Sequence, residues 1–344
     1  MYHLVRNGIR AFARNWAQKP TPFYLRYRIT DRCNARCKMC NFWRESPHKE
    51  LKTEQVKETL NILSRMGVGS AVFLGGEPLL RADLVEILAH AKEKCNMTCG
   101  FATNGFFLAE KAPELRPYVS LIAVSLDSTI PEEHNSIRGV KIFDQAIQGI
   151  QAARQQGIPI TINQCVFKNT LSQMERLADL ARLLGCTFSA FPVIKASRPE
   201  VGDLCQIDDE FLDMDQWYKV SMNLKKTHSN FIITKDMLNW VYAGGFASPS
   251  SIRCRTASTC ICLNCEGNIE LPCIRFPKLR IPYTDLERAW NSPTVREIQK
   301  KCGFYKLCQD CLMNCHYEAS FLFHPGKQIE YMVKLLNQIR NQKH

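Results

Sequence analysis

The sequence has no stretch that approaches the roughly 18 consecutive apolar residues of a membrane-spanning helix. Its first residues also lack the apolar core of a secretion signal. Hydrophobic residues make up 45% and charged residues 23% of the 344-residue chain, which is ordinary for a globular protein. These features argue against a membrane span and against export, so we predict a cytoplasmic protein.

The cysteines lack the pattern of a secreted disulfide framework, in which pairs are spread through a short chain. Their number, 17, is odd, and most lie in two regions, residues 33–40 and 254–315, with the close spacing of metal ligands. We therefore predict metal ligation in a reducing compartment. The cysteines outside these regions are predicted to be small buried hydrophobes: Cys95, Cys99, Cys165, Cys186 and Cys205.

The chain also lacks the aromatic-interleaved basic stripe that single-stranded nucleic-acid binding favours. Its net charge is +12 and its pI is near 9.0, but the basic residues are spread along the chain. A solvated surface is the simpler explanation of this charge. Anionic substrates, an acidic leader peptide and an anionic membrane surface are the remaining alternatives.

Three cysteines, Cys33, Cys37 and Cys40, follow a strand-like run at residues 23–30. Structural zinc sites and ordinary iron-sulfur sites use four protein ligands, so three thiolates leave a position for substrate or cofactor. The spacing resembles the cluster loop of the radical S-adenosylmethionine (radical SAM) superfamily. The resemblance implies a 4Fe-4S cluster that chelates the amino and carboxylate groups of S-adenosylmethionine (SAM). It further implies one-electron cleavage of SAM to methionine and a 5′-deoxyadenosyl radical, with a reductant such as flavodoxin or ferredoxin.

A second motif, Gly75, Gly76, Glu77 and Pro78, ends a short apolar run about 35 residues after the cysteines. Glycines let the backbone approach a ligand closely, and Glu77 offers a hydrogen-bond acceptor. Alone, such a motif would be explained as a turn. Its place one βα unit after the cysteines matches the superfamily, in which this loop binds the amino group of SAM.

From residue 23 to about 195 strand-like and helix-like segments alternate, which predicts an α/β fold with a parallel sheet. We expect strands at residues 23–30, 70–75, 98–102, 119–126, 158–166 and 187–194. Alternation alone is compatible with a doubly wound sheet. The resemblance to radical SAM enzymes implies instead an open (β/α)6 partial barrel of the TIM type. In both folds ligands bind at the carboxyl ends of the strands.

The resemblance also places SAM contacts at the ends of later strands. Arg138 would meet the cofactor carboxylate, because a guanidinium matches that group in shape and charge. Met39 would pack near adenine. For Asp127 and Arg138 the alternative is a turn or a surface ion pair. The remaining expected contacts are with the methionine and ribose parts of SAM or border the site: Thr103, Asn104, Ser125, Asp127 and Asn163.

The second cysteine region includes a hairpin that is expected to turn at residues 266–268, an expected helix at residues 285–300 and a Cys-x-x-Cys-x-x-x-Cys ending. A zinc ribbon is the structural alternative, but one zinc ion needs only four ligands. The region resembles the auxiliary-cluster extension called SPASM or Twitch. Nine cysteines lie in it: Cys254, Cys260, Cys262, Cys265, Cys273, Cys302, Cys308, Cys311 and Cys315.

On this resemblance, one auxiliary 4Fe-4S cluster is held by Cys254, Cys260, Cys273 and Cys315. A full SPASM domain has a further cysteine downstream, which this sequence lacks. A second cluster at Cys302, Cys308 and Cys311 would therefore have an open or non-cysteine position, or only one auxiliary cluster is present. Such clusters relay electrons or bind substrate. Cys262 and Cys265 have no predicted role.

We expect five segments along the chain. They are an N-terminal amphipathic helix at residues 1–20, a radical SAM barrel at 21–195, a bridging helical segment at 196–253, an auxiliary-cluster domain at 254–320 and a C-terminal helix at 321–344. Apolar and arginine side chains lie on different sides of the first helix. Docking on the barrel explains this pattern more simply than peripheral membrane contact.

The predicted function is a radical SAM oxidoreductase or C–H functionalising enzyme that abstracts hydrogen from a peptide, a lipid or another small biosynthetic substrate. No acid or base is assigned. Only about 20 residues precede the first strand, which disfavours a leader-peptide-binding domain. Residues 311–318 resemble the end of enzymes that transfer the adenosyl group to hopanoid or isoprenoid lipids. From a different class, the alternative is a non-catalytic iron-sulfur or zinc protein that binds nucleic acid.

Overall fold

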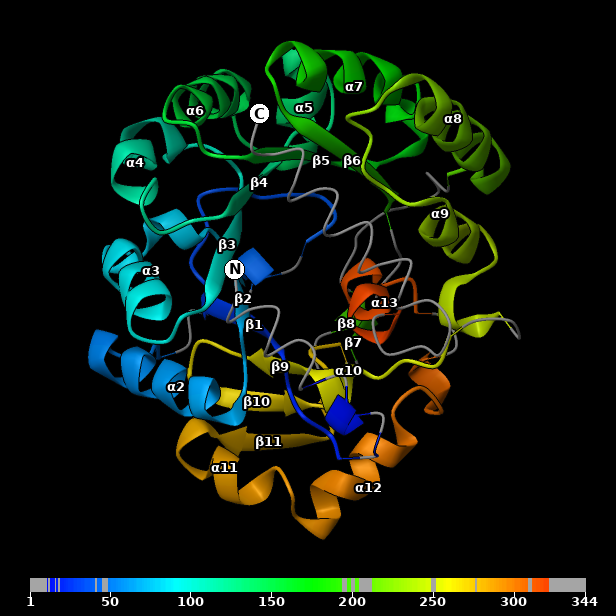
Figure 1. The fold of residues 1–344 in the computed structure, drawn as a ribbon. Helices are drawn as coiled ribbons and strands as arrows, with labels where there is room; N and C mark the ends of the chain where they lie inside the picture. Colours follow the sequence, from blue (N-terminus) through cyan, green and yellow to red (C-terminus); the bar gives the residue numbers. More distant parts are fainter. Residues whose placement is uncertain are drawn as a thin grey trace.

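The computed structural model describes residues 11–321, apart from residues 12, 16, 18, 41, 45–48, 194–196, 199–201, 204–211, 249–251, 276 and 309–310. Most of the N-terminal helix expected at residues 1–20 lies outside the described residues. So does nearly all of the C-terminal helix expected at residues 321–344. Within the described part, an arc of strands lies inside an arc of helices (Figure 1).

Among the residues that the structure describes, nine strands form one sheet in the order β11-β10-β9-β1-β2-β3-β4-β5-β6, and the neighbours from β9 through β6 pair in parallel. The first six strands lie close to the ranges expected from sequence, which confirms the βα alternation. Their bounds are β1 Tyr24–Thr30, β2 Ser70–Gly75, β3 Thr98–Thr103, β4 Leu121–Ser125, β5 Ile160–Val166 and β6 Thr187–Pro192. A separate two-stranded sheet joins β7 Ser197–Arg198 to β8 Gly202–Asp203.

The helices of the alternating region all lie on the outer side of the strands (Figure 1), which confirms the partial barrel and excludes a doubly wound sheet with helices on both faces. Their amphipathic spacing, such as Val56, Leu60 and Leu63, gives each helix one apolar face to bury. Their bounds are α2 Thr53–Met66, α3 Leu84–Glu93, α4 Leu108–Leu115, α5 Pro131–Arg138, α6 Phe143–Gln155 and α7 Gln173–Leu183.

The two faces of β1 have different environments. Leu25, Tyr27 and Ile29 have 0% exposure and belong to the same apolar core as residues of α2. Because strand side chains alternate, the residues between them, including Arg26 and Arg28, point to the inner side of the sheet. The barrel interior is therefore lined in part by charged side chains.

The hairpin expected near residues 266–268 is present, formed by β9 Cys260–Leu263 and β10 Asn268–Leu271, and β11 Leu279–Pro282 extends it. The sequence did not predict that β9 pairs in parallel with β1, with Tyr24 opposite Cys260 and Arg26 opposite Cys262. Strands more than 200 residues apart leave no local signal of such pairing. The second cysteine region thus continues the barrel sheet.

The bridge between these regions contains α8 Met214–Thr227 and α9 Lys235–Tyr242, and a short α10 Thr256–Thr259 precedes β9. The prediction of a single helix at residues 285–300 was wrong. It is divided into α11 Leu286–Ala289 and α12 Pro293–Lys301, because Pro293 begins a new helix whose N-cap Ser292 accepts a hydrogen bond from the Val295 amide.

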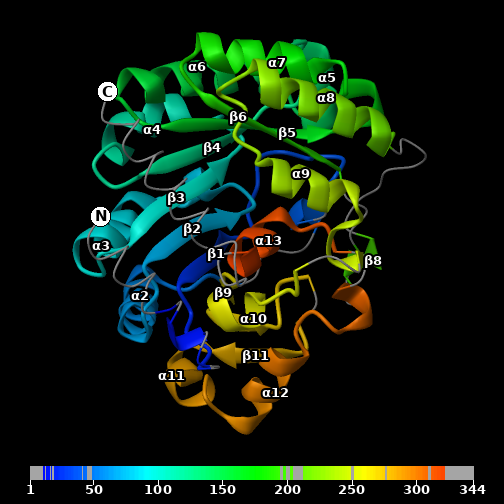
Figure 2. The same cartoon turned by 45° about the vertical axis from the view of Figure 1, so that its right-hand side comes forward.

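The last described helix, α13 Asn314–Phe321, lies inside the ring of elements in both views (Figures 1 and 2). It contacts α9 and α10. Within the described residues, no helix is long and apolar enough to cross a membrane. The inward position of α13 brings the final cysteine, Cys315, toward the barrel interior rather than to the outer surface.

Candidate functional site

The first three cysteines converge in the loop that follows β1. Cys37 is buried, and Cys33 and Cys40 are half-buried. Burial raises the pKa of the Cys40 thiol to about 11, and the neighbouring thiols of Cys37 and Cys33 contribute to this rise. The Ala35 amide donates a hydrogen bond to Cys33 Sγ at 3.4 Å. Three close thiols with a backbone donor fit a thiolate-bound cluster, because metal binding displaces the thiol protons and an N–H group stabilises the resulting sulfur charge.

The last turn of α5 holds this loop in place. The Arg36 amide donates to the Arg138 carbonyl at 2.8 Å, and the Lys38 amide donates to the Ile137 carbonyl at 3.0 Å. Gly139 follows with a φ of +68°, and a Cβ there would lie 2.5 Å from the Arg36 carbonyl oxygen. The glycine therefore satisfies both the left-handed turn and the close approach of the cysteine loop.

A buried ion pair places a cation beside the cysteines. Arg138 donates to both oxygens of Asp127, from Nε at 2.7 Å and from Nη2 at 2.9 Å. Its remaining Nη1 lies 3.8 Å from Cys37 Sγ. Asp127 Oδ1 also accepts from the Cys165 amide at 3.0 Å. Asp127, expected to reach SAM, thus uses its carboxylate to orient Arg138, which presents one nitrogen toward the cysteine loop.

His134 completes the packing around Asp127. Its Nδ1 accepts a hydrogen bond from the Asp127 amide at 3.1 Å. Burial lowers the pKa of His134 to about 3, and the nearby Arg138 charge contributes to this fall. The imidazole is therefore neutral at physiological pH. The sequence analysis did not identify His134 as part of the site, since a lone histidine carries no specific signal.

Glu77 is a buried acceptor at the end of β2. It receives hydrogen bonds from the Thr103 hydroxyl at 2.7 Å, the Asn104 amide at 2.8 Å and the Leu79 amide at 3.1 Å. A carboxylate has about four acceptor positions, so one remains for a ligand. Burial raises the pKa of Glu77 to about 7, although its three donors favour the charged form. A buried carboxyl with a free acceptor position suits a ligand that donates N–H groups, such as an amino group.

This pKa predicts a pH dependence of SAM binding. Below pH 7 the Glu77 carboxyl is mostly protonated in the free protein, whereas the N–H groups of a bound amino group favour the carboxylate, which accepts them. Binding below pH 7 therefore releases a proton, and the affinity for SAM should rise as the pH increases from about 6 to 7.5. Equilibrium binding by calorimetry at several pH values measures this effect. In Glu77→Gln we expect weaker binding with little pH dependence, and an equally steep profile would contradict the assignment.

The two glycines before Glu77 allow a close approach between two backbone segments, and their contact with SAM stays a prediction. A Cβ at Gly75 would collide with the Thr30 carbonyl, and one at Gly76 with the Arg32 carbonyl. Both neighbours belong to the backbone that leads into the cysteine loop. The glycines thus allow the motif to pack against that loop, which positions Glu77 near the three cysteines.

Several other residues expected to contact SAM lie at the carboxyl ends of the strands, where their side chains form hydrogen bonds with other side chains of the protein. Thr103 contacts Glu77, and the Asn104 side chain donates to Asn34 Oδ1 in the cysteine loop at 2.7 Å. Asn163 accepts from the Ser189 hydroxyl at 2.6 Å and pairs in register with the half-buried Ser125. Met39 is half-buried. Their roles in SAM binding stay predictions. Asn34 was missed, because nothing in the sequence marks its pairing with Asn104.

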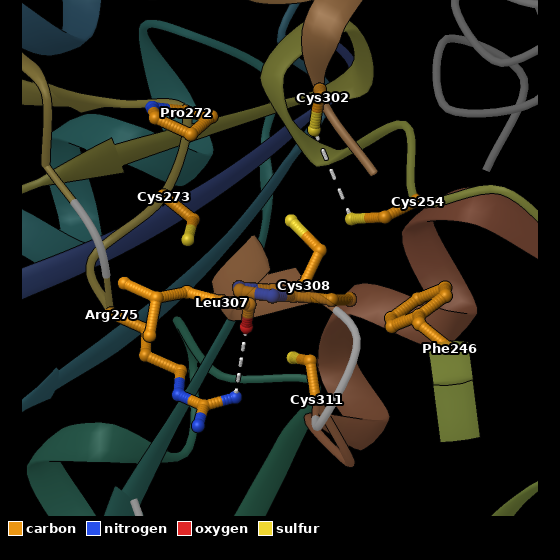
Figure 3. A pocket seen from close by; sticks show the side chains of 10 residues that line it. Phe246, Cys254, Pro272, Cys273, Arg275, Cys302, Leu307, Cys308 and Cys311 are labelled. Atoms are coloured by element: carbon orange, nitrogen blue, oxygen red, sulfur yellow. Dashed lines mark hydrogen bonds between the residues drawn. The ribbon is translucent and has the colours of Figure 1, made fainter. Parts of the chain in front are cut away.

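In the second region, five cysteines line one pocket (Figure 3). Cys302 donates to Cys254 Sγ at 3.9 Å, and this hydrogen bond lowers the pKa of Cys254 to about 5. Burial raises the pKa of Cys273 to about 12. The pocket is formed by segments from both ends of the region and is lined by Phe246, Cys254, Pro272, Cys273, Arg275, Cys302, Leu307, Cys308, Cys311 and His316.

This pocket combines cysteines that the sequence analysis divided between two auxiliary clusters. Cys254 and Cys273 come from the first expected set, and Cys302, Cys308 and Cys311 form the second. Among the described residues, no three Cys, His, Asp or Glu side chains are arranged to hold a single metal ion. A cluster of several irons holds its thiolates farther apart than one ion does. The assignment of individual ligands stays a prediction.

The remaining cysteines of the region are also buried. Cys260 and Cys262 pack together on β9, beside Tyr24. Cys315 lies in the first turn of α13, and the next residue, His316, interacts with the Cys262 thiol. Cys265 is close to the first site, where its sulfur lies 3.0 Å from Asp31 Oδ2. The hairpin turn therefore contacts the segment that leads into the first cysteine loop.

The cysteines outside the two regions were expected to be buried hydrophobes. Cys95, Cys99 and Cys186 are buried, which confirms the expectation for these three. Cys165 is half-buried, and Cys205 lies outside the described residues.

Comparisons with known proteins agree with this geometry. Residues 27–181 match the model of the radical SAM superfamily. The AdoMet-dependent heme synthase of Methanosarcina barkeri is 29% identical, and the match covers 91% of this chain and 99% of the relative. A protein of the same name from Oleidesulfovibrio alaskensis is 27% identical, with 59% of this chain and 55% of the relative covered. This chain thus spans about half the length of the latter relative.

The fold also resembles solved structures. Streptococcus suis SuiB bound to S-adenosylmethionine matches with a TM-score of 0.67 and 18% identity, over 90% of this chain and 77% of that chain. The same protein has been solved with its precursor peptide SuiA. At this level of identity the likeness establishes a shared fold, which includes the cysteine-rich C-terminal part of the chain.

Proposed function

The chain belongs to the radical SAM superfamily, and from this premise we propose that the enzyme abstracts a hydrogen atom from a C–H bond of a carboxylate-bearing tetrapyrrole. The observation that carries the proposal is the match to an AdoMet-dependent heme synthase over nearly the whole length of both chains. Tetrapyrroles of the heme type carry carboxylate side chains, and the net charge of +12 suits an anionic substrate.

The residues of the first site fit the cofactors of this superfamily, a 4Fe-4S cluster and SAM. When bound, these cofactors supply the reductive cleavage of SAM that leads to hydrogen abstraction. Cys33, Cys37 and Cys40 would hold the cluster, and Glu77 would accept hydrogen bonds from the amino group of SAM. Arg138, oriented by Asp127, would bind the carboxylate of SAM through its remaining nitrogen.

We further infer that the second region holds at least one auxiliary iron-sulfur cluster. Five thiols around one pocket support this, because clusters are bound by cysteine thiolates. Two of these thiols are already in contact, since Cys302 donates a hydrogen bond to Cys254 Sγ. Such a cluster would relay electrons or bind substrate. The net reaction of the enzyme depends on which of these two roles the cluster has.

A peptide substrate is the second candidate, favoured by the shared fold with SuiB, which has been solved with a precursor peptide. A lipid substrate and peripheral membrane contact stay predictions, as does the cytoplasmic location. The non-catalytic nucleic-acid-binding alternative is wrong, because superfamily membership and the enzyme relatives identify an enzyme.

Deuterium transfer distinguishes these substrates. The reconstituted enzyme is incubated with SAM, dithionite and a porphyrin carboxylic acid deuterated on its side chains, and 5′-deoxyadenosine is analysed by mass spectrometry. We expect deuterium in 5′-deoxyadenosine with the free acid and much less with the same porphyrin as its methyl ester, which lacks the negative charges. Transfer from a deuterated peptide and none from the porphyrin acid would reject the tetrapyrrole proposal.

A further inference from the structure

Arg26 is a cation inside the barrel that the radical SAM site does not use. It lies on β1 between Leu25 and Tyr27, which face the apolar core, so its side chain points to the inner side of the sheet. In register it lies beside Val72 of β2 and Cys262 of β9. In Figures 1 and 2, α13 lies on this inner side of the sheet.

Among the described residues, no carboxylate lies within ion-pair distance of Arg26, and the nearby Glu318 interacts with it only over a longer distance. Within the described part of the chain, no ion pair includes Arg26, and its Nη1 is buried without a hydrogen-bond partner. Arg26 as a residue is half-buried, but a guanidinium nitrogen withdrawn from water without an acceptor is costly, since this removes its hydration. The position therefore calls for a negative group within the protein interior.

Cysteine sulfurs are one source of that charge, since Arg26 pairs in register with Cys262. Burial alone would lower the pKa of Arg26, but the neighbouring sulfurs of Cys315, Cys262 and Cys260 raise it. Two of these residues lie on β9, and the third comes from α13, so separate elements direct thiols toward one guanidinium. Glu318 lies one helical turn after Cys315 on α13 and is exposed, and its carboxylate has the charge opposite to that of Arg26.

We propose that Arg26 is the counter-cation, on the inner side of the sheet, of the auxiliary cluster held in part by Cys260 and Cys315, and that it raises the reduction potential of that cluster. The inference rests on the auxiliary cluster of the proposed function. Reduction adds one negative charge to a cluster, and a nearby cation stabilises the reduced form. Arg26 would not touch the substrate or the reacting atoms. It would act on the cluster through the thiolates that hold it, and in this sense it is a positioning residue. Glu318 opposes its effect.

A redox titration of the auxiliary cluster alone tests the proposal. In the full chain with Cys33, Cys37 and Cys40 replaced by alanine, only auxiliary clusters remain, and their reduction is followed by electron paramagnetic resonance at fixed potentials. For Arg26→Gln we expect a more negative midpoint. A tenfold fall in the reduced-to-oxidised ratio at a given potential corresponds to about 59 mV for one electron.

Three further variants separate charge from structure. Arg26→Lys keeps the charge and should keep most of the midpoint. Arg288→Gln removes a surface arginine that is 84% exposed and paired with Asp285, and should leave the midpoint unchanged. Glu318→Gln should move the midpoint in the positive direction. If Arg26→Gln does not incorporate iron, the result for Glu318→Gln decides, and an unchanged midpoint there overturns the inference.

The outcomes also distinguish this inference from the proposed function. If the parent triple-alanine chain gave no cluster signal, the chain would hold no auxiliary cluster, and that part of the proposed function would be rejected. A clear signal with the same midpoint in the parent chain and in Arg26→Gln would overturn only the role of Arg26. Equal midpoints together with weaker binding of a porphyrin acid to Arg26→Gln would assign the guanidinium to a substrate carboxylate instead.

Discussion

Replacing Cys33, Cys37 and Cys40 together with alanine is expected to reduce 5′-deoxyadenosine formation to the level of an enzyme-free control. Alanine cannot ligate iron, and these thiols are the only cysteines in the loop beside Glu77 and Arg138. The reconstituted protein is assayed without oxygen, with SAM and dithionite, by chromatography. Iron analysis of the same variant counts what the second cysteine region still binds.

A matched control removes a cysteine outside both regions. Cys95 is buried between α3 and β3, where burial raises its thiol pKa to about 11. Cys95→Ala should therefore retain SAM cleavage. If the triple variant cleaved SAM above background, the three cysteines would not be the cluster ligands. Loss of cleavage in both variants would point to a general effect on folding.

Asp127→Ala should have the largest effect on stability, because it leaves Arg138 buried without its carboxylate. Removing one partner of a buried ion pair typically costs about 3–5 kcal/mol. Both Arg138 hydrogen bonds to Asp127 are lost, and the Asp127 carboxylate is fully buried. We expect a lower free energy of unfolding in urea and a smaller cluster content after reconstitution.

Two variants test whether this cost comes from the unpaired charge. Asp127→Asn keeps an acceptor and the side-chain volume, so its loss of stability should be smaller than that of Asp127→Ala. The double variant Asp127→Ala with Arg138→Met removes both charges and should recover part of the loss. Strictly additive losses in the double variant would mean that the pair does not contribute as a unit.

Local sequence patterns predicted much of the fold and of the first site. Strand alternation with apolar helical faces predicts the six βα units, because both periods follow from backbone geometry. The spacing of Cys33, Cys37 and Cys40 predicts their convergence, since one short loop joins them. The same reasoning could not predict that Asp127 orients Arg138, because motif spacing does not reveal how side chains pair.

Long-range pairing limited the prediction of the second region. The hairpin near Gly267 was evident from its turn, but the pairing of β9 with β1 depends on tertiary packing. The ligand sets implied by the resemblance divide cysteines that line one pocket, since Cys254 and Cys302 meet there although 48 positions separate them. Proximity along a chain is a weak guide where several loops enclose one space.

The pairing of β9 with β1 has a consequence for how the molecule resists self-association. A strand at the margin of a sheet presents unpaired backbone groups that can recruit a second chain. Here β1, which leads directly to the first cysteines, is an interior strand with β2 on one side and β9 on the other. The C-terminal hairpin thereby acts as a cover for the N-terminal strand. A chain shortened before residue 260 would leave β1 open to intermolecular strand pairing.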